Sequence, residues 1–227
     1  MTAKQPTPGI RPSTDDLIAS LTADVPPVPR IWPAGRRLAA WTGGLALILS
    51  IAALAIGVRA DLPVRLGDAS FVAQLLALLA VAVASAALAL RSSVPGEEPP
   101  LRLSAIVILL ATAGLALACG REPAAAAHDS DFVAAGWPCA AVTVLIATLP
   151  LVLLAGLVRR AAPLVPTVAG LLAGGAAFFA AVVALQLVCP HDERWHLLVW
   201  HLGPVALGLL ASAALGASWL ARWRRVA

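Results

Sequence analysis

Charged residues are scarce in this sequence. Only 12% of its 227 residues are Asp, Glu, Lys or Arg, whereas 60% are hydrophobic and the mean hydropathy is +0.90. An ordinary soluble domain is about a quarter charged. The sixteen Lys and Arg residues exceed the twelve Asp and Glu residues by only four, and they form no dense basic tract. This composition excludes a disordered chain and a nucleic-acid binder, and it indicates an integral membrane protein.

Cysteine is scarce as well, because the chain has three, Cys119, Cys139 and Cys189. This number excludes a disulfide-rich secreted module. No two of them form a Cys-x-x-Cys motif, which disfavours a membrane thiol oxidoreductase. The apolar runs hold few ionisable groups, with His201 and Asp68 as the candidates, and no internal repeat is visible, which disfavours a small transporter. These two classes are the alternatives to a regulatory protein without enzyme activity.

Long uncharged runs predict an all-α, polytopic membrane protein. A helix rises about 1.5 Å per residue, so roughly 20 apolar residues cross a hydrocarbon core about 30 Å thick. Ala, Leu and Val fill the runs without the alternation of barrel strands. We therefore predict a bundle of six transmembrane helices, which together form a sensor domain over residues 38–227. The expected spans are 38–58, 69–90, 103–120, 139–158, 164–188 and 197–221.

The distribution of Lys and Arg predicts the orientation of this bundle. An even number of spans places both termini on one side, and twelve of the sixteen basic residues fall on that side. The other four lie in loops 59–68, 121–138 and 190–196. The positive-inside rule then predicts a multi-pass protein of the bacterial inner membrane with cytoplasmic termini. About 37 polar and proline-bearing residues precede the first run, so it is not a cleaved signal peptide.

The cytoplasmic segment 1–37 is expected to hold a short helix at about residues 14–24. Ser13 or Thr14 can cap it, and its first turn carries two carboxylates, which the helix dipole favours there. Its acidic and apolar positions are Asp15, Asp16, Leu17, Ile18 and Leu21. The apolar ones form one stripe. The prolines of residues 25–29 cannot continue the helix and predict an extended, semi-rigid tether.

This helix could lie on the bilayer or bind a protein. Membrane-surface helices are usually rich in Lys and Arg, and the cytoplasmic leaflet is negatively charged. The acidic polar face of residues 14–24 therefore favours a hydrophobic groove on a partner protein.

Thiols and imidazoles gather near the expected periplasmic boundary, in the three cysteines and in His128, His191, His196 and His201. Two thiols there could form a disulfide if their Cα atoms lie within about 7 Å. Cysteine also suits soft metal ions and histidine suits zinc or copper, although the spacing matches no established metal motif. Cys139 is expected at a helix N-terminus, where a thiolate is stabilised. The alternative is structural, with Cys as an apolar filler and His201 hydrogen-bonded inside the bundle.

Two sequence elements resemble the NrsF family. Residues 14–18 (Thr-Asp-Asp-Leu-Ile), Leu21 and residues 25–28 (Val-Pro-Pro-Val) are similar to its N-terminal signature, which the family pairs with six membrane helices. Its other marks are a Cys before span four, here Cys139, and a Cys-Pro after span five, here Cys189-Pro190. A His-x-x-x-Trp-His element follows at residues 196–201. The resemblance covers roughly residues 14–225.

The resemblance implies an integral membrane anti-sigma factor. Its partner would be an extracytoplasmic-function sigma factor, and the protein itself would not bind nucleic acid. The cysteine pair would sense heavy metals or oxidative stress, with a soft or borderline metal ion as the signal and no cofactor required. The implied sigma-binding residues are Asp15, Asp16, Leu17, Ile18 and Leu21. The implied sensor residues are Cys139, Cys189, His191, His196 and His201, with Cys139 and Cys189 as the metal ligands.

Overall fold

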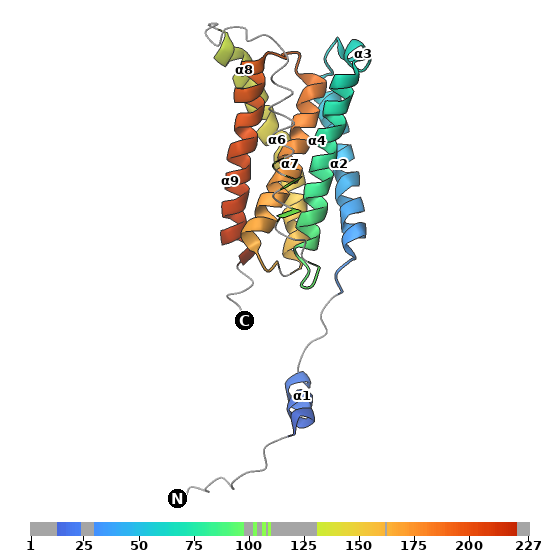
Figure 1. The fold of residues 1–227 in the computed structure, drawn as a ribbon, viewed down its shortest axis with the longest axis vertical. Coiled ribbons are helices and arrows are strands. Elements are labelled where there is room, and N and C mark those ends of the chain that lie inside the picture. The colour runs from blue at the N-terminus through green and yellow to red at the C-terminus, as the bar shows by residue number, and fades with distance from the viewer. Residues whose placement is uncertain are drawn as a thin grey trace, which may run out of the picture. The chain divides into compact units, whose positions relative to one another are not determined.

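The structure of the protein is a computed structural model that describes residues 13–23, 30–97, 102–103, 106–107, 109, 131–161 and 163–221. Its elements are α1 (Thr14–Thr22), α2 (Ala34–Ile56), α3 (Leu62–Arg65), α4 (Ala69–Arg91), α6 (Phe132–Arg159), α7 (Pro166–Val188), α8 (Arg194–His196), the π-helical η1 (Leu197–Leu202) and α9 (Gly203–Ser218). The described residues contain no strand, which confirms the all-α prediction (Figure 1).

The described residues hold five helices that are long and apolar enough to cross a membrane, and not the six that we predicted. They are α2, α4, α6, α7 and the run from Arg194 to Ser218. The expected span 103–120 lies almost wholly outside the described residues, so it adds no helix of spanning length to these five. The helix expected to start at residue 139 starts at Phe132 instead.

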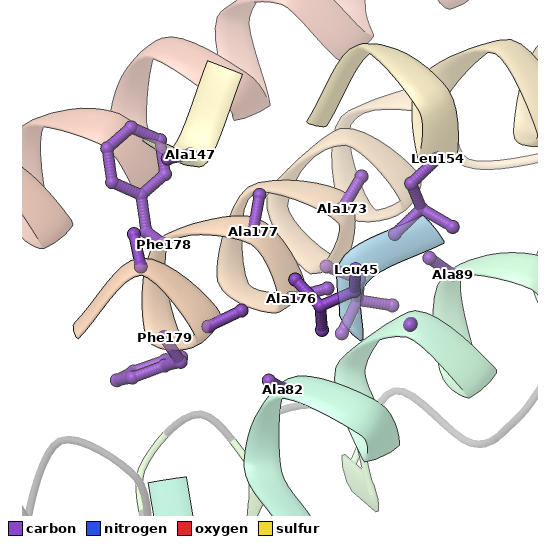
Figure 2. Close-up of a cluster of buried hydrophobic side chains, with 14 of the residues drawn as sticks. Leu45, Ala82, Ala89, Ala147, Leu154, Ala173, Ala176, Ala177, Phe178 and Phe179 are labelled. Carbon is purple, nitrogen blue, oxygen red and sulfur yellow. The ribbon is translucent and has the colours of Figure 1, made fainter. Parts of the chain in front are cut away.

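The chain divides into two compact units, residues Met1–Ile31 and Trp32–Ala227. In the second unit the apolar helices run side by side, and α7 packs against α2, α4, α6 and α9 (Figure 1). Nearly every residue of α7 is buried. Small side chains such as Ala173, Ala176 and Ala177 let the neighbouring helices approach it closely (Figure 2). The core of the bundle is therefore built around α7.

The closest approach of α7 to α9 depends on glycine. A Cβ at Gly170 would collide with the carbonyl oxygen of Ser212 and with the Cα of Gly216, which are both backbone atoms. A Cβ at Gly208 would collide with the ring of Phe178. Backbone cannot rotate aside as a side chain can, so the two helices would have to separate if Gly170 gained a side chain.

We expect Gly170→Ala to destabilise the bundle by about 1–3 kcal/mol, the usual cost of inserting a methyl group into a well-packed core. Thermal melting of the detergent-solubilised protein measures this loss. Gly156→Ala in α6 is the matched control, because a Cβ there meets nothing within 4 Å. It should leave the melting temperature unchanged or raise it, since alanine is the better helix former. Equal melting temperatures for the two variants would contradict the packing argument.

The first unit contains α1, which begins with a complete capping box. The Ser13 hydroxyl accepts a hydrogen bond from the Asp16 backbone at 3.1 Å, and the Asp16 carboxylate accepts one from the Ser13 backbone at 3.2 Å. These bonds satisfy two of the donors that a helix start leaves open. No described residue of α1 is buried, and Leu17, Ile18 and Leu21 are 48%, 54% and 67% exposed.

Candidate metal and thiol site

Cys189 is fixed where α7 ends. The residue before a proline is disfavoured in helical conformation, and Cys189, which precedes Pro190, has extended dihedral angles (φ −86°, ψ 123°). Its backbone N–H still donates to the carbonyl of Leu185 at 2.7 Å. The residue is buried, with 5% of its surface exposed. The Cys-Pro sequence thus stops the helix and holds the thiol inside the bundle at that end.

Cys139 faces this thiol from α6. The two Sγ atoms lie 3.4 Å apart, and both cysteines are free thiols. The expectation that Cys139 lies at a helix N-terminus is wrong, because α6 starts at Phe132 and continues through Pro138. The carbonyl of Ala135 is 4.0 Å from the Cys139 sulfur. The dipole of a helix start therefore does not act on Cys139, whose partner is the second cysteine.

A π-helical turn brings two histidines to the same site. His196 and His201 are five residues apart, which in an α-helix would place them about 140° apart around the axis. Residues 197–202 instead form η1, whose i to i+5 bonding stacks residues with this spacing. The two imidazole rings lie 5.3 Å apart, edge to face. Both histidines are buried.

Trp200 locks η1 against the start of α6. Its indole lies so close to Gly136 that any Cβ there would collide with the ring. The ring also packs against Phe132, with 5.6 Å between ring centroids. Gly136 precedes Cys139 by less than one turn, so this contact sets the position of η1 relative to the cysteine. The lack of a side chain at Gly136 thereby helps His201 to approach Cys139.

The resulting cluster contains Cys139, Cys189, His196 and His201, whose possible ligand atoms all lie within 4.8 Å of one another. The Cys189 sulfur is 3.5 Å from Nε2 of His196. In a tetrahedral zinc site, bond lengths of about 2.3 Å to sulfur and 2.05 Å to nitrogen place two sulfurs about 3.8 Å apart and sulfur and nitrogen about 3.6 Å apart. These two observed spacings are close to the tetrahedral values and the four donors all lie within 4.8 Å of one another, so a small closure of the set would fit a tetrahedral thiophilic ion.

His201 supports the same interpretation. It is 2% exposed, and neither of its ring nitrogens has a hydrogen-bond partner in the part of the chain that the structure describes. A buried polar group without a partner is costly, and most such groups in folded proteins are satisfied. The expected alternative, a histidine hydrogen-bonded inside the bundle, stays a prediction, because His201 also interacts with the Cys189 thiol. A coordinated ion would satisfy one of these nitrogens.

Cys189 has the richer polar surroundings of the two thiols. Its sulfur lies 3.4 Å from that of Cys139 and 3.5 Å from Nε2 of His196. A thiolate binds metal and attacks an oxidant, whereas a neutral thiol does neither well. The site therefore offers two adjacent sulfur ligands, and each becomes a soft ligand when its thiol ionises.

The remaining expected residues lie outside this cluster. His191 is partly exposed, stacks on His196 with 4.9 Å between ring centroids and faces the Glu193 carboxylate at 3.6 Å. The five expected sigma-binding residues lie on the exposed surface of α1. Cys119 and His128 lie outside the described residues.

Sequence reasoning missed two buried arginines, Arg37 and Arg59. It assigned both to the flanks of the first span, where basic residues are common. Nothing in the sequence distinguished them from the exposed arginines.

The chain was also compared with known proteins. A family model described as "NrsF: Negative regulator of sigma F" matches residues 21–223, which is nearly the whole chain. No curated protein and no solved structure matches significantly. The match covers every element of the second unit, including all four residues of the cluster.

Proposed function

Because the chain belongs to the NrsF family and is thus a negative regulator of a sigma factor, we propose that α1 binds an extracytoplasmic-function sigma factor and that the Cys139–Cys189 site controls its release. The family match carries the regulatory part of this proposal. The four-residue cluster supports the sensing part, and the exposed apolar stripe of α1 supports the binding part.

The α1 helix has the properties of a docking element. Its three large apolar side chains are exposed, and an amphipathic helix of this kind binds by placing such a face in a hydrophobic groove. Nine residues are too few for a stable isolated helix in water, so the capping box and the partner together would stabilise it. Asp15 and Asp16 give the helix a negative first turn, which suits a basic rim on the sigma factor.

The four-residue cluster has the ligand chemistry to bind a metal ion as the signal. Cys139 and Cys189 would supply soft sulfur ligands, and His196 and His201 would supply borderline nitrogen ligands. Cadmium and zinc match this set, since both accept four-coordinate sulfur and nitrogen sites. The same two thiols could instead lose two electrons and two protons to an oxidant and form a disulfide, which would serve as an oxidative signal.

We place the protein in the bacterial inner membrane with both termini in the cytoplasm. The excess of Lys and Arg on the terminal side of the spans supports this orientation. The thiol site would then lie at the periplasmic boundary, where metals and oxidants arrive before they reach the cytoplasm. The sigma factor would be held on the opposite side, out of reach of RNA polymerase.

Co-purification tests the proposed partner. A candidate extracytoplasmic-function sigma factor is co-expressed with the intact protein or with a form that lacks residues 1–30, and each is purified from solubilised membranes. We expect the intact protein to retain the sigma factor and the truncated form to lose it. Washing the intact complex with Cd²⁺ should release the sigma factor. Retention by the truncated form would exclude α1 as the docking element.

A further inference from the structure

An ion-pair network around the buried Arg59 links the thiol loop to α2. Arg59 follows the end of α2, is 5% exposed, and donates to both carboxylate oxygens of Asp192 at 3.0 and 2.7 Å. It also donates to the Asp61 carboxylate at 2.6 and 2.8 Å and to the Pro190 carbonyl at 3.4 Å. Its backbone N–H donates to the Leu187 carbonyl at 3.0 Å. We call these contacts the Arg59 clamp.

The Arg59 clamp holds the segment that joins two residues of the cluster, Cys189 and His196. Cys189 and His196 enclose the loop 190–195, and Asp192 and Pro190 both lie in it. Arg65, on α3, pairs with the same Asp192 carboxylate. The two hydrogen-bonded carboxylates raise the pKa of Arg59 above its already high value, with Asp192 as the larger cause. Any shift of the loop as Cys189 and His196 close on an ion would therefore act directly on Arg59.

The outer half of α2 packs less tightly than its first half. The buried residues of α2 are Arg37, Trp41 and Leu45, all in its first half, whereas Ile48, Leu49 and Ala52 are only partly buried against the core. Residues 54–58 are exposed, and burial resumes at Arg59. The clamp is thus the polar contact that fixes the end of α2 against α7.

The first half of α2 is anchored at the opposite end of the bundle. Arg37 donates to the carbonyl of Leu90 at 3.2 Å and to that of Leu157 at 3.4 Å, near the ends of α4 and α6. Helix C-termini carry partial negative charge, so the guanidinium is favoured there. The indole N–H of Trp41 donates to the carbonyl of Pro150 at 3.0 Å. These contacts form a pivot about which the outer half of α2 can move.

We propose that α2 carries the signal from the thiol site, with Arg59 as the positioning residue that couples the site to this helix. The inference rests on the proposed function, because the signal is ligand binding at the cluster and the recipient is the N-terminal segment. The chain passes from that segment directly into α2, so a rotation of α2 about its pivot reaches the segment without another helix. The coupling is reciprocal, since sigma binding would change the metal affinity by the same factor.

Hydrogen–deuterium exchange of the full-length protein in detergent, with and without Cd²⁺, tests this inference. We expect Cd²⁺ to speed amide exchange in the outer half of α2, because movement of the 190–195 loop loosens the clamp. Arg59→Gln should bind Cd²⁺ at least as tightly as the intact protein, because residue 59 is not a ligand and binding no longer has to loosen the clamp, yet α2 should no longer respond to the ion. Arg59→Lys keeps the positive charge but lacks the guanidinium group that hydrogen-bonds to two carboxylates at once. In this variant, amide exchange in α2 should respond only weakly to Cd²⁺. Arg91→Gln is the matched control, because it removes an exposed arginine of α4 and should respond as the intact protein does.

The outcomes distinguish a failure of the proposed role of α2 from a failure of the proposed metal site. Retained Cd²⁺ binding in Arg59→Gln also shows that the variant is folded, since the four ligands come from different elements. If the intact protein binds Cd²⁺ but α2 does not respond, or if Arg59→Gln responds as the intact protein does, the role of α2 is excluded while the metal site stands. If the intact protein does not bind Cd²⁺, the sensing function fails and this inference fails with it.

Discussion

Replacing Cys189 by serine is expected to lower the affinity of the purified protein for Cd²⁺ by at least about 100-fold. Changes in the residues that merely support metal ligands already cost about 10–100-fold, and this change removes a ligand itself. Cys189 is also the more buried of the two thiols, with Nε2 of His196 3.5 Å from its sulfur. Isothermal titration of the detergent-solubilised protein, together with the ultraviolet absorption of the sulfur-to-cadmium bond, measures the loss.

The controls test whether the loss of Cd²⁺ affinity is specific to the four-residue cluster or follows from removing any thiol of the chain. Cys119→Ser removes the third thiol of the chain and leaves all four ligands in place, so Cd²⁺ affinity should not change. In cells, Cys139→Ser and Cys189→Ser should each keep the sigma factor bound during metal stress. Wild-type Cd²⁺ affinity in Cys189→Ser would remove this cysteine from the metal site, and normal induction in either mutant would remove the pair from sensing.

Sequence reasoning located the reactive residues because composition alone decides which segments enter a membrane. The uncharged runs predicted helices that agree in place with α2, α4, α6, α7 and α9 within a few residues at most ends. They also predicted that the three cysteines and the four histidines lie near the same boundary. The structure brings four of these seven residues together, Cys139, Cys189, His196 and His201. The position of a helix end along the chain is a one-dimensional property, and hydropathy is enough to predict it within a few residues.

The geometry of the cluster could not be predicted in the same way. The spacing of His196 and His201 separates them in an α-helix, and only the π-turn at residues 197–202 aligns them. A single π-turn has no clear sequence signal. The start of α6 was missed because the span was expected to begin at residue 139, directly after Pro138, whereas the helix continues through this proline.

The buried arginines were missed for a related reason. Hydropathy ends a span at the first charge, so Arg37 was placed outside the first span, but the structure places it within α2. Its partners are the carbonyls of Leu90 and Leu157, and those of Arg59 include Asp192, more than 100 residues away. Such pairings depend on which helix ends meet in the bundle, and that arrangement is not visible in local sequence patterns.

Truncating the apolar stripe of α1 should weaken sigma-factor binding at least as strongly as Cys189→Ser weakens Cd²⁺ binding. Leu17 and Leu21 lie one turn apart on the same face, and each is about half exposed or more. If both fill a groove on the sigma factor, each change to alanine should cost about 2 kcal/mol, as truncation of an interface anchor does. The double variant Leu17→Ala/Leu21→Ala would then bind roughly 1,000-fold more weakly. Alanine is the best helix former, so the loss would report on docking rather than on helix stability.

Ala19→Gln is the matched control, because residue 19 lies on the opposite side of α1 from the stripe. It should bind the sigma factor as tightly as the intact protein. Surface plasmon resonance with the full-length protein in lipid nanodiscs and the co-purifying sigma factor in solution measures all three affinities. The variant that loses affinity shows which face of α1 contacts the sigma factor. If Ala19→Gln weakened binding as much as the leucine variant, the acidic face would be the one in contact, and the apolar stripe would then lie against something other than the sigma factor.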